Sequence, residues 1–403
     1  MRVLYFTAVP LIDESNGGNI CCRNHVRRLA EDPGIELYGI AAVERDHAAA
    51  TNAFLSEHMV EHHVIPFRES HVRPERHGLR PMASFLGTAA FQYPWELRAL
   101  NQQHLQEGIE WAVAGYAIDT VVIDYTPSAY FLRLPLRNVR TCLIKLNREA
   151  DFYAEQIRLG KIHHGRLTAK ISHARLRRAE RAIEASVDKV VAIGEPDLPR
   201  SRTRSAAVVV TPFLNPKEPR WSYRSSKTAF FVGNVGHFPN WQAVEWIATQ
   251  LGPRVAAERP ELGFAVVGAD AKSVPEPWRQ PNISYLGLAD RDGVQGLFGG
   301  AADLMLCPLE NDFGVKFKAV EALAHGTPLL PSRQTLLGLP QLDDEPALDL
   351  ARPDEAAAVV CTLLSSRAAV EGLAARQREA QVAFIESQSG VWSRVLGSIP
   401  APA

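Results

Sequence analysis

Short apolar runs alternate along the chain with longer segments in which apolar residues recur every third or fourth position. Short runs bounded by Gly and Pro predict buried strands, and the longer periodic segments predict amphipathic helices. The predicted strands are Arg2–Ala8, Ile35–Val43, His62–Pro66, Thr120–Asp124, Val139–Leu146, Lys189–Ile193, Ala206–Val210, Thr228–Gly233, Gly263–Gly268, Ile283–Leu286, Leu304–Pro308 and Pro328–Pro331. The predicted helices are Asn19–Ala30, Trp95–Ala114, two segments between Glu149 and Ala185, Asn240–Ala257, Asp290–Phe298, Val315–His325, Pro353–Ser366 and a last segment between Arg367 and Gln388.

The alternation of strands and helices in both halves predicts two α/β domains, each built on a parallel sheet. The chain has 403 residues, which is enough for two hydrophobic cores. Pro212–Tyr223 holds three prolines and shows no periodicity, as is typical of a linker. We therefore predict an N-terminal domain over residues 1–213, a linker over 214–226 and a C-terminal domain over 227–380.

Composition excludes several classes of protein. The formal net charge is −1, which gives no global attraction for nucleic acid. The five cysteines are scattered without a CxxC pair, which favours a reducing cytoplasm over a disulfide scaffold. No apolar run is long enough to cross a bilayer, and the N-terminus is typical of a strand rather than of a signal peptide. We expect a cytoplasmic protein.

The segment Asn311–Pro328 gives the clearest indication of a ligand-binding site. A loop containing Gly314 leads into a predicted helix that holds Lys316 and Lys318 near its start. Helix N-termini present unpaired N–H groups and a partial positive charge, so they suit phosphates. Glu321 lies three residues after Lys318 and therefore on the same helix face. Cations for a diphosphate and a carboxylate for sugar hydroxyls indicate a nucleotide-sugar site, although an ordinary surface Lys–Glu pair would give the same spacing.

Three motifs in order resemble the GT-B glycosyltransferases, of the group 1 or family 4-like set. They are the Gly314-x-Lys316-x-Lys318-x-x-Glu321-Ala322 helix with Gly326 and Pro328, the Phe230–Trp241 strand–glycine loop–helix start, and the Asp188–Asp197 strand. The resemblance implies an α/β GT-B fold, with two Rossmann-like parallel-sheet domains facing a central cleft. It also implies that residues 381–403 form a C-terminal helix or tail that returns toward the N-terminal domain.

The resemblance implies an activity as well. A sugar would move from a nucleotide-diphosphate sugar in the C-terminal domain to an acceptor hydroxyl in the N-terminal domain, with retention of anomeric configuration. The acceptor would be a saccharide, a lipid-linked group or a small molecule, in polysaccharide or glycoconjugate biosynthesis. Lys316 and Lys318 would stabilise the leaving diphosphate electrostatically, so no cofactor and no metal is expected.

Donor-binding candidates come from three loops. Gly17 and Gly18 precede the first helix, and paired glycines allow a close backbone approach to a ligand. In the second loop Gly233, Asn234 and Gly236 could cradle phosphate, with His237 as an additional donor.

The third loop departs from the family pattern. Relatives carry two glutamates eight residues apart, and Glu321 matches the second, where the ribose would bind. The first position holds Phe313, so we expect Asp312, Glu310 or the main chain through Phe313, Gly314 and Val315 to contact the transferred sugar.

Acceptor candidates follow two strands of the N-terminal domain. Asp124 ends a buried strand, at the edge where such sheets bind ligands, and is either catalytic or a cap for the next turn. Asn147 and Glu149 resemble a family His-Asn-x-Glu segment in which Leu146 takes the place of the histidine. We predict Lys145, Asn147 and Glu149 as acceptor-binding residues.

Two further features receive weaker interpretations. The helix from Lys161 to Arg181 is rich in Lys, Arg and His, with Leu167, Ile171, Ala174 and Ile183 toward one face. It is either a solvated helix packed by its apolar face or a peripheral contact with the inner face of a membrane. His58, His62 and His63 have no cysteine nearby, so we predict no metal site.

Two rival functions remain open from the sequence. A nucleotide-sugar epimerase of the same architecture would use the donor site without an acceptor, and would form an epimeric sugar from donor alone. A non-catalytic nucleotide- or sugar-binding module would bind without turnover across a broad acceptor panel. A Rossmann dehydrogenase is disfavoured because the chain lacks its glycine fingerprint.

Overall fold

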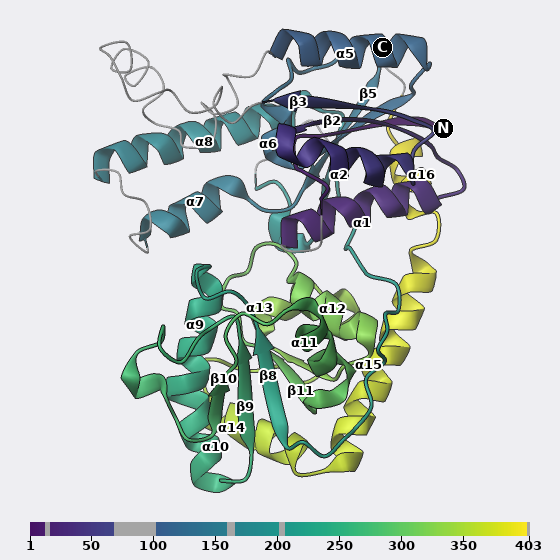
Figure 1. Cartoon of the computed structure of the whole chain (residues 1–403). Coiled ribbons are helices and arrows are strands. Elements are labelled where there is room, and N and C mark those ends of the chain that lie inside the picture. Colours follow the sequence, from purple (N-terminus) through teal and green to yellow (C-terminus); the bar gives the residue numbers. More distant parts are fainter. Residues whose placement is uncertain (13–16, 68–101, 159–165, 201–205, 401–403) are drawn as a thin grey trace. The chain divides into compact units, whose positions relative to one another are not determined.

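The computed structural model describes residues 1–12, 17–67, 102–158, 166–200 and 206–400. The chain divides into two compact units (Figure 1). Unit 1 comprises Met1–Thr211 together with Ser389–Ala403, and unit 2 comprises Pro212–Gln388. Each unit is built on one parallel sheet covered by helices, as the sequence predicted.

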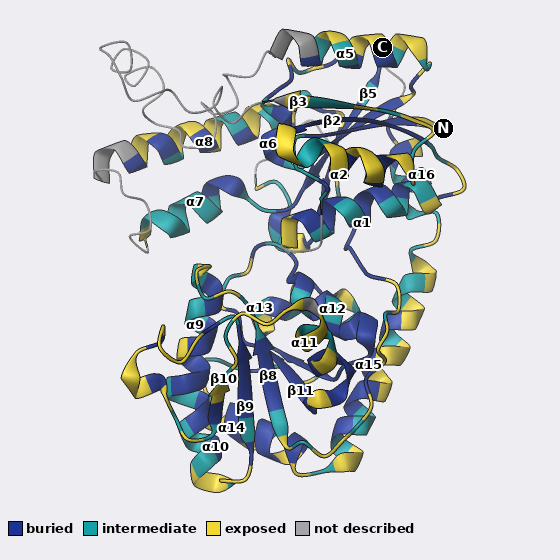
Figure 2. Cartoon of the chain, viewed as in Figure 1, coloured by how far each residue is buried: buried dark blue, intermediate teal, exposed yellow. Residues whose placement is uncertain are grey.

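Unit 1 holds a seven-stranded sheet in the order β3-β2-β1-β4-β5-β6-β7, with every neighbouring pair parallel. Its central strands are buried on both faces, which is why they are continuous apolar runs in the sequence (Figure 2). The strands are β1 (Arg2–Thr7), β2 (Glu36–Glu44), β3 (Glu61–Phe67), β4 (Thr120–Asp124), β5 (Arg140–Lys145), β6 (Lys189–Ala192) and β7 (Ala206–Val209). Each lies where the pattern predicted it.

The helices of unit 1 differ from expectation at three places. They are α1 (Gly17–Glu31), α2 (Arg45–Ser56), α5 (Gln102–Gly115), α6 (Thr126–Ala129), α7 (Glu149–Arg158), α8 (Arg166–Ser186) and α16 (Val391–Gly397). Neither the four-residue α6 nor α2 was predicted from the sequence; α2 buries only Thr51, Phe54 and Leu55 and so shows little periodicity. The sequence analysis also missed α16. The part of the predicted helix before residue 102 lies outside the described residues.

The predicted apolar face of α8 is wrong. Ile171 is 44% exposed and Ala174 is exposed, whereas Ser172, Glu180 and Glu184 are buried. The buried residues of α8 recur every four positions. Two of them, Glu180 and Glu184, are acidic because they pair with the buried Lys145 of β5. Lys161–Gly165 lie outside the described residues, and the side chain of Leu167 is not described. The membrane contact of this helix stays a prediction.

Unit 2 holds a five-stranded parallel sheet in the order β10-β9-β8-β11-β12. Its strands are β8 (Thr228–Val232), β9 (Gly263–Val267), β10 (Ile283–Tyr285), β11 (Leu304–Cys307) and β12 (Leu329–Pro331). Its α-helices are α9 (Phe238–Trp246), α10 (Gly252–Glu258), α11 (Arg291–Gly296), α12 (Phe317–His325), α13 (Arg333–Leu336), α14 (Pro353–Leu364) and α15 (Arg367–Ser387).

Two predicted helices of unit 2 are altered in detail. The single helix expected over Asn240–Ala257 is α9, a π-helical turn over Ile247–Leu251 and then α10. Pro253 explains the break, because proline has no N–H for the helical ladder. The helix expected from Val315 begins only at Phe317, since Gly314 has φ +68° and Lys316 is extended.

The proline-rich segment expected as a linker packs within unit 2. The backbone N–H groups of Lys217 and Trp221 donate to the carbonyls of Ala324 and His325 at the end of α12. Trp221 is 7% exposed. The tertiary contacts thus order a segment whose sequence shows no periodicity.

The C-terminal segment packs onto the sheet of unit 1. The ring of Trp392 on α16 meets His25 edge to face at 5.9 Å between centroids. The Ser393 N–H donates to Asp32 Oδ2 at 2.9 Å, and Lys189 Nζ donates to the Val395 carbonyl at 3.1 Å. These contacts place α16 against α1 and β6.

No single helix among the described residues is long and apolar enough to cross a membrane. The neighbouring helices α14 and α15 pass the same test only when taken together as a bent pair.

Candidate functional site

The strand order marks one ligand-binding edge in each unit. Successive strands are added toward one edge of the sheet up to β3 in unit 1 and β10 in unit 2, and toward the other edge from β4 and β11 onward, so the strand order reverses between β1 and β4 and between β8 and β11. Parallel sheets bind ligands at the carboxyl ends of the strands beside such a reversal. The loops after β8 and β11, and those after β1 and β4, are therefore the candidate sites.

Hydrogen bonds hold the loop after β8 in a compact conformation. Gly233 N–H donates to the Val267 carbonyl at 2.9 Å, and Gly236 N–H donates to Asn234 Oδ1 at 2.8 Å. His237 caps α9, and Asn240 in its first turn donates to the Asn234 carbonyl at 2.8 Å. The loop is therefore held by its own side chains next to a helix N-terminus.

Lys318 is half-buried, with its ammonium group beside this loop. Its Nζ donates to Asn240 Oδ1 at 2.6 Å and lies 4.2 Å from the centroid of the Phe231 ring. A Cβ added at Gly233 would lie 2.5 Å from the same Nζ and 2.6 Å from Asn240 Cγ, so a larger residue there would displace both side chains. The second predicted lysine thus lies beside the predicted glycine loop, 78 residues away from its partner Asn240.

Lys316 turns back toward the loop after β11. Its Nζ donates to the carbonyls of Phe313 at 2.5 Å and Gly314 at 2.9 Å, and only 8% of the residue is exposed. It occupies the N-cap position of α12 rather than the first helical turn. Lys316 therefore shapes the loop and adds positive charge to the N-terminus of α12.

His237, Lys316 and Lys318 lie close enough to influence one another's charge. Burial and the nearby Lys316 lower the pKa of Lys318 to about 8. Burial, followed by the charges of Lys318 and Lys316, also lowers the pKa of His237. A basic group whose pKa is lowered by its basic neighbours gains stability when an anion joins the cluster. The geometry thus suits an anionic ligand at the start of α9 and α12.

The remaining donor candidates lie around this cluster in unit 2. Glu321 is on α12 one turn after Lys318, with 26% of its side chain exposed and its Oε1 3.3 Å from Lys217 Nζ. Phe313 and Val315 are each 8% exposed and pack into the loop. Asp312 is exposed, and Glu310 accepts a bond from Gln242 Nε2 at 3.2 Å. Their contacts with a donor stay predictions.

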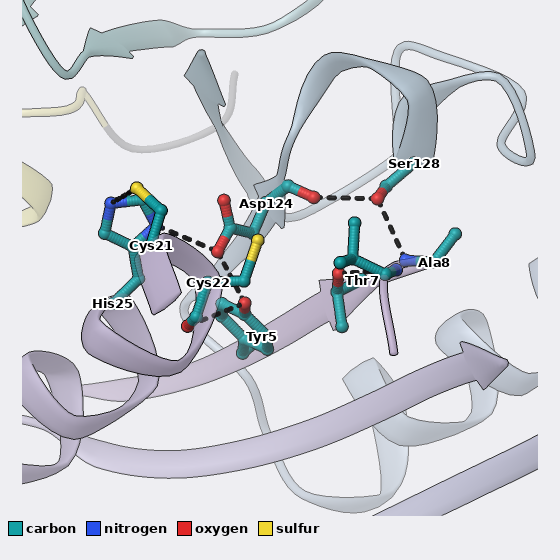
Figure 3. Close-up of polar contacts among 9 residues, drawn as sticks. Tyr5, Thr7, Ala8, Cys21, Cys22, His25, Asp124 and Ser128 are labelled. Carbon is teal, nitrogen blue, oxygen red and sulfur yellow. Dashed lines mark hydrogen bonds and ion pairs between the residues drawn. The ribbon is translucent and has the colours of Figure 1, made fainter. Parts of the chain in front are cut away.

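Asp124 lies in a buried cluster between β1, α1 and β4 (Figure 3). Its Oδ2 accepts hydrogen bonds from the Tyr5 hydroxyl at 2.5 Å and from His25 Nδ1 at 2.9 Å. Burial opposes the charge of His25, but the Asp124 carboxylate raises its pKa well above the ordinary value. Asp124 is 0% exposed, and its hydrogen bonds connect β4 to β1 and α1. Its predicted catalytic role stays a prediction.

The glycine pair of the first loop opens α1. Gly17 and Gly18 are its first two residues, and both are exposed. Asp13–Asn16 lie outside the described residues. The start of the loop is held at Ala8, whose N–H donates to Ser128 Oγ at 2.9 Å, next to Asp124 (Figure 3).

Lys145 is the centre of a second buried cluster. Its Nζ contacts Glu184 Oε1 on α8, and lies 3.0 Å from Glu180 Oε1. Burial lowers the pKa of Lys145, but the two carboxylates outweigh that effect and raise it. Both oxygens of Glu180 also accept N–H bonds from Glu149 and Ala150, which caps α7.

Glu149 differs from its neighbours because no cation pairs with it in the described contacts. Burial and the charge of Glu180 raise its pKa to about 8, although Tyr125 and Asn147 donate hydrogen bonds to it. The residue is 6% exposed, and among the described residues its Oε1 has no hydrogen-bond partner. Tyr125, at the end of β4, has φ +74°, which is unusual for a side chain of this size.

The described residues contain no group of three or more His, Cys, Asp or Glu side chains that could hold a metal ion. His62 Nε2 instead contacts Asn52 Oδ1 at 3.1 Å, and His63 Nε2 contacts the Tyr116 hydroxyl at 3.2 Å.

Sequence reasoning missed the partners of the predicted residues. They are Asn240 for Lys318, Tyr5 and His25 for Asp124, and Glu180 and Glu184 for Lys145. Only one signal was available: Glu180 and Glu184 continue, at spacings of four, the line of Ser172 and Leu176 along α8. The other pairs join residues far apart in the chain.

Residues 226–366 match the family model described as Glycosyl transferases group 1. No curated protein sequence matches the chain.

Solved structures match over nearly the whole chain, at low identity. A variant of S. aureus TarM, solved with fondaparinux, α-GlcNAc-glycerol and UDP, is 8% identical with a TM-score of 0.66, covering 99% of this chain and 100% of that one. Sucrose-phosphate synthase from Thermosynechococcus elongatus is 16% identical with a TM-score of 0.64, at the same coverage. Anabaena HepE, solved with UDP and glucose, is 11% identical with a TM-score of 0.57, also at 99% and 100%.

Proposed function

We propose that this protein transfers a sugar from a nucleotide-diphosphate sugar to an acceptor hydroxyl, because residues 226–366 match the model of the group 1 glycosyl transferases and the whole chain has the GT-B fold. The observation that carries the donor assignment is the proximity of His237, Lys316 and Lys318 at the starts of α9 and α12. The UDP in the TarM and HepE structures supports a diphosphate ligand for this fold.

The proposed mechanism is electrostatic. Cleavage of the sugar–phosphate bond develops negative charge on the leaving diphosphate. Lys318, Lys316 and the N–H groups of α12 would stabilise that charge, and the hydrogen bonds that the two lysines make to Asn240 and to the loop carbonyls hold them near the start of α12. The loop after β8 would carry the phosphates on its backbone, and Glu321 would accept hydrogen bonds from the ribose hydroxyls. We propose retention at the anomeric carbon on the family resemblance, which NMR of the product's anomeric centre tests.

A ligand screen tests the donor proposal. Nucleotide-diphosphate sugars that differ in base and sugar should separate into binders and non-binders by thermal shift, because a ligand at a hundredfold its Kd stabilises the folded state by about 2.7 kcal/mol. The binding donor should then release nucleoside diphosphate in the presence of a hydroxyl acceptor. An epimeric sugar formed without acceptor would favour an epimerase, and the absence of any binder would reject the donor site.

Turnover is expected to continue in excess chelator after metal-free purification. The reason is that, at the proposed site, two lysines and a helix N-terminus would balance the charge of the diphosphate. The measurement is the rate of nucleoside diphosphate release with and without chelator. Complete loss of activity, restored only by magnesium or manganese, would show that a metal supplies this charge.

Glu321→Ala is expected to weaken donor binding by roughly 1.5–3 kcal/mol, because hydrogen bonds between the carboxylate and the ribose would be lost. Calorimetric titration with the donor measures the change. Glu379→Ala, which removes an exposed carboxylate from α15, is the matched control and should bind normally. Equal affinities of the two variants would leave Glu321 as the surface partner of Lys217.

A further inference from the structure

One asparagine connects the glycine loop of unit 2 to a lysine of the proposed donor site. Asn240 lies in the first turn of α9 and is 8% exposed. Its Oδ1 accepts a hydrogen bond from Lys318 Nζ at 2.6 Å, and its Nδ2 donates to the Asn234 carbonyl at 2.8 Å. The side chain of Asn234 in turn accepts from the Gly236 N–H. A single network of hydrogen bonds therefore joins α12, α9 and the loop after β8.

The two bonds of the Asn240 side chain require an amide. An ammonium group can only donate hydrogen bonds and a backbone carbonyl can only accept them, so the oxygen must face Lys318 and the nitrogen must face Asn234. An aspartate at this position could bind the lysine but could not donate to the carbonyl. A leucine could do neither. The contacts on both sides thus depend on the amide chemistry of this one residue.

The amide also leaves the charge of Lys318 uncancelled. Among the described residues, Lys318 makes no ion pair with a carboxylate, and the centroid of the Phe231 ring lies 4.2 Å from its Nζ. A neutral acceptor supports the charged ammonium through a hydrogen bond without adding negative charge. A carboxylate in the same place would balance the ammonium and repel an anion. The arrangement therefore keeps one positive charge available to an anionic ligand.

The packing around Asn240 restricts the position of the lysine. A Cβ added at Gly233 would lie 2.6 Å from Asn240 Cγ and 2.5 Å from Lys318 Nζ, so the loop, the amide and the ammonium are in close contact. Because the amide is buried and bonded at both ends, it fixes where the ammonium lies. A ligand therefore does not need to order that side chain when it binds, which lowers the entropic cost of binding.

We propose that Asn240 is a positioning residue of the donor site, which holds the Lys318 ammonium beside the loop after β8 and keeps its charge available to the diphosphate; this inference rests on the proposed donor function. Asn240 acts through Lys318 and not by contact with the nucleotide. The role differs from a purely structural one, because the amide controls the protonation of Lys318 as well as its place.

The groups that face Lys318 leave a range of pH in which its protonation can be followed. They are Lys316 at the start of α12, His237 at the start of α9 and Cys307 at the end of β11. Burial raises the pKa of the Cys307 thiol and lowers the pKa of His237, so neither group changes its charge between pH 7 and pH 9. The pKa of Lys318 is lowered to about 8. Nucleotide affinity should therefore report the protonation of Lys318 over this range.

Two substitutions should move the pH dependence in opposite directions. Asn240→Asp pairs the ammonium with a carboxylate and keeps it charged to higher pH, so nucleotide affinity should be at least about tenfold weaker than wild type at pH 7 and change less than about twofold up to pH 9. Asn240→Leu removes the bond that favours the charged form. The midpoint of the fall in affinity should then lie below the wild-type value near pH 8.

Calorimetric titration of the full-length chain with UDP, GDP, ADP and dTDP between pH 6 and pH 9 measures these affinities, and a melting curve shows whether each variant is folded. Each comparison uses one nucleotide, so the ionisation of the nucleotide itself cancels. Asn282→Asp is the matched control. It loses a similar bond, from Nδ2 to the Gly252 carbonyl at 3.0 Å, and gains the same charge just before β10, at the amino end of the sheet. It should keep the wild-type pH profile.

The outcomes separate this inference from the proposed function. A wild-type chain that binds none of the four nucleotides would reject the donor site itself. A wild-type chain that binds one of them, with the same midpoint in wild type and in the folded Asn240 variants, would overturn the role of Asn240 and leave the donor site standing. If Asn240→Asp does not fold, the midpoint of Asn240→Leu decides by the same criterion.

Discussion

Lys318→Met is expected to lower turnover by roughly a hundredfold to a thousandfold, the usual effect of removing one preorganised contact to a developing negative charge. The change should leave the protein folded. The folded-state pKa of Lys318 is lowered from 10.5 to about 8, so above pH 8 the unfolded chain binds more protons than the folded one. The free energy of unfolding accordingly rises with pH between about 8 and 10.5. At pH 7 the lowered pKa of Lys318 corresponds to a loss of about 3 kcal/mol in folding stability.

The lowered pKa of Lys318 should also make the affinity for a diphosphate depend on pH. A diphosphate requires the charged form, so the affinity of the wild-type chain for UDP should fall about tenfold as pH rises from 7 to 9. Lys318→Met should lose that dependence. The measurements are steady-state kinetics, calorimetric titration at several pH values and a melting curve.

Lys227→Met provides the matched control, because Lys227 is exposed and precedes β8 at the opposite end of the strand. It should behave as wild type in every measurement. A folded Lys318→Met protein with near-normal turnover would remove the main support for the donor site.

Glu149→Gln is expected to make the protein more stable at pH 8, by up to about 4 kcal/mol, and to have little effect near pH 4.5. The folded-state pKa of Glu149 is raised to about 8 from the ordinary 4.5. Between these values the unfolded chain releases a proton that the folded chain keeps, so stability is lost as pH rises. Glutamine resembles the protonated acid and cannot ionise, so the Glu149→Gln protein should not lose this stability as pH rises.

Denaturant unfolding of both proteins at pH 5 and pH 8 measures this difference, provided that the transition of unit 1 is followed separately. Glu155→Gln is the control, since Glu155 lies on the same helix but pairs with Arg158 at 3.3 Å. A Glu149→Gln protein that is less stable than wild type at pH 8 would mean that Glu149 is ionised and compensated in the folded state.

The sequence by itself determined the two parallel sheets and the order of their strands along the chain. Buried parallel strands such as Thr120–Asp124 are continuous apolar runs, and their boundaries are marked by polar and turn residues. It also placed Gly233, Lys316, Lys318 and Glu321 together in one hypothesis, because a family motif and the helical spacing both act over short distances. Helix α2 escaped detection because only three of its residues are buried.

Only the tertiary structure decided what those side chains do. Lys318 lies beside the loop of Gly233 because β8 and β11 are neighbours in the sheet, an adjacency that no local pattern encodes. Asp124, which looked like a reactive group at a strand end, is enclosed by Tyr5 and His25 from β1 and α1. Lys145 is paired with two glutamates of α8, so its charge has only a small effect on Glu149. Burial and charge pairing depend on contacts between distant segments, so the protonation of these groups follows from the fold and not from their spacing along the chain.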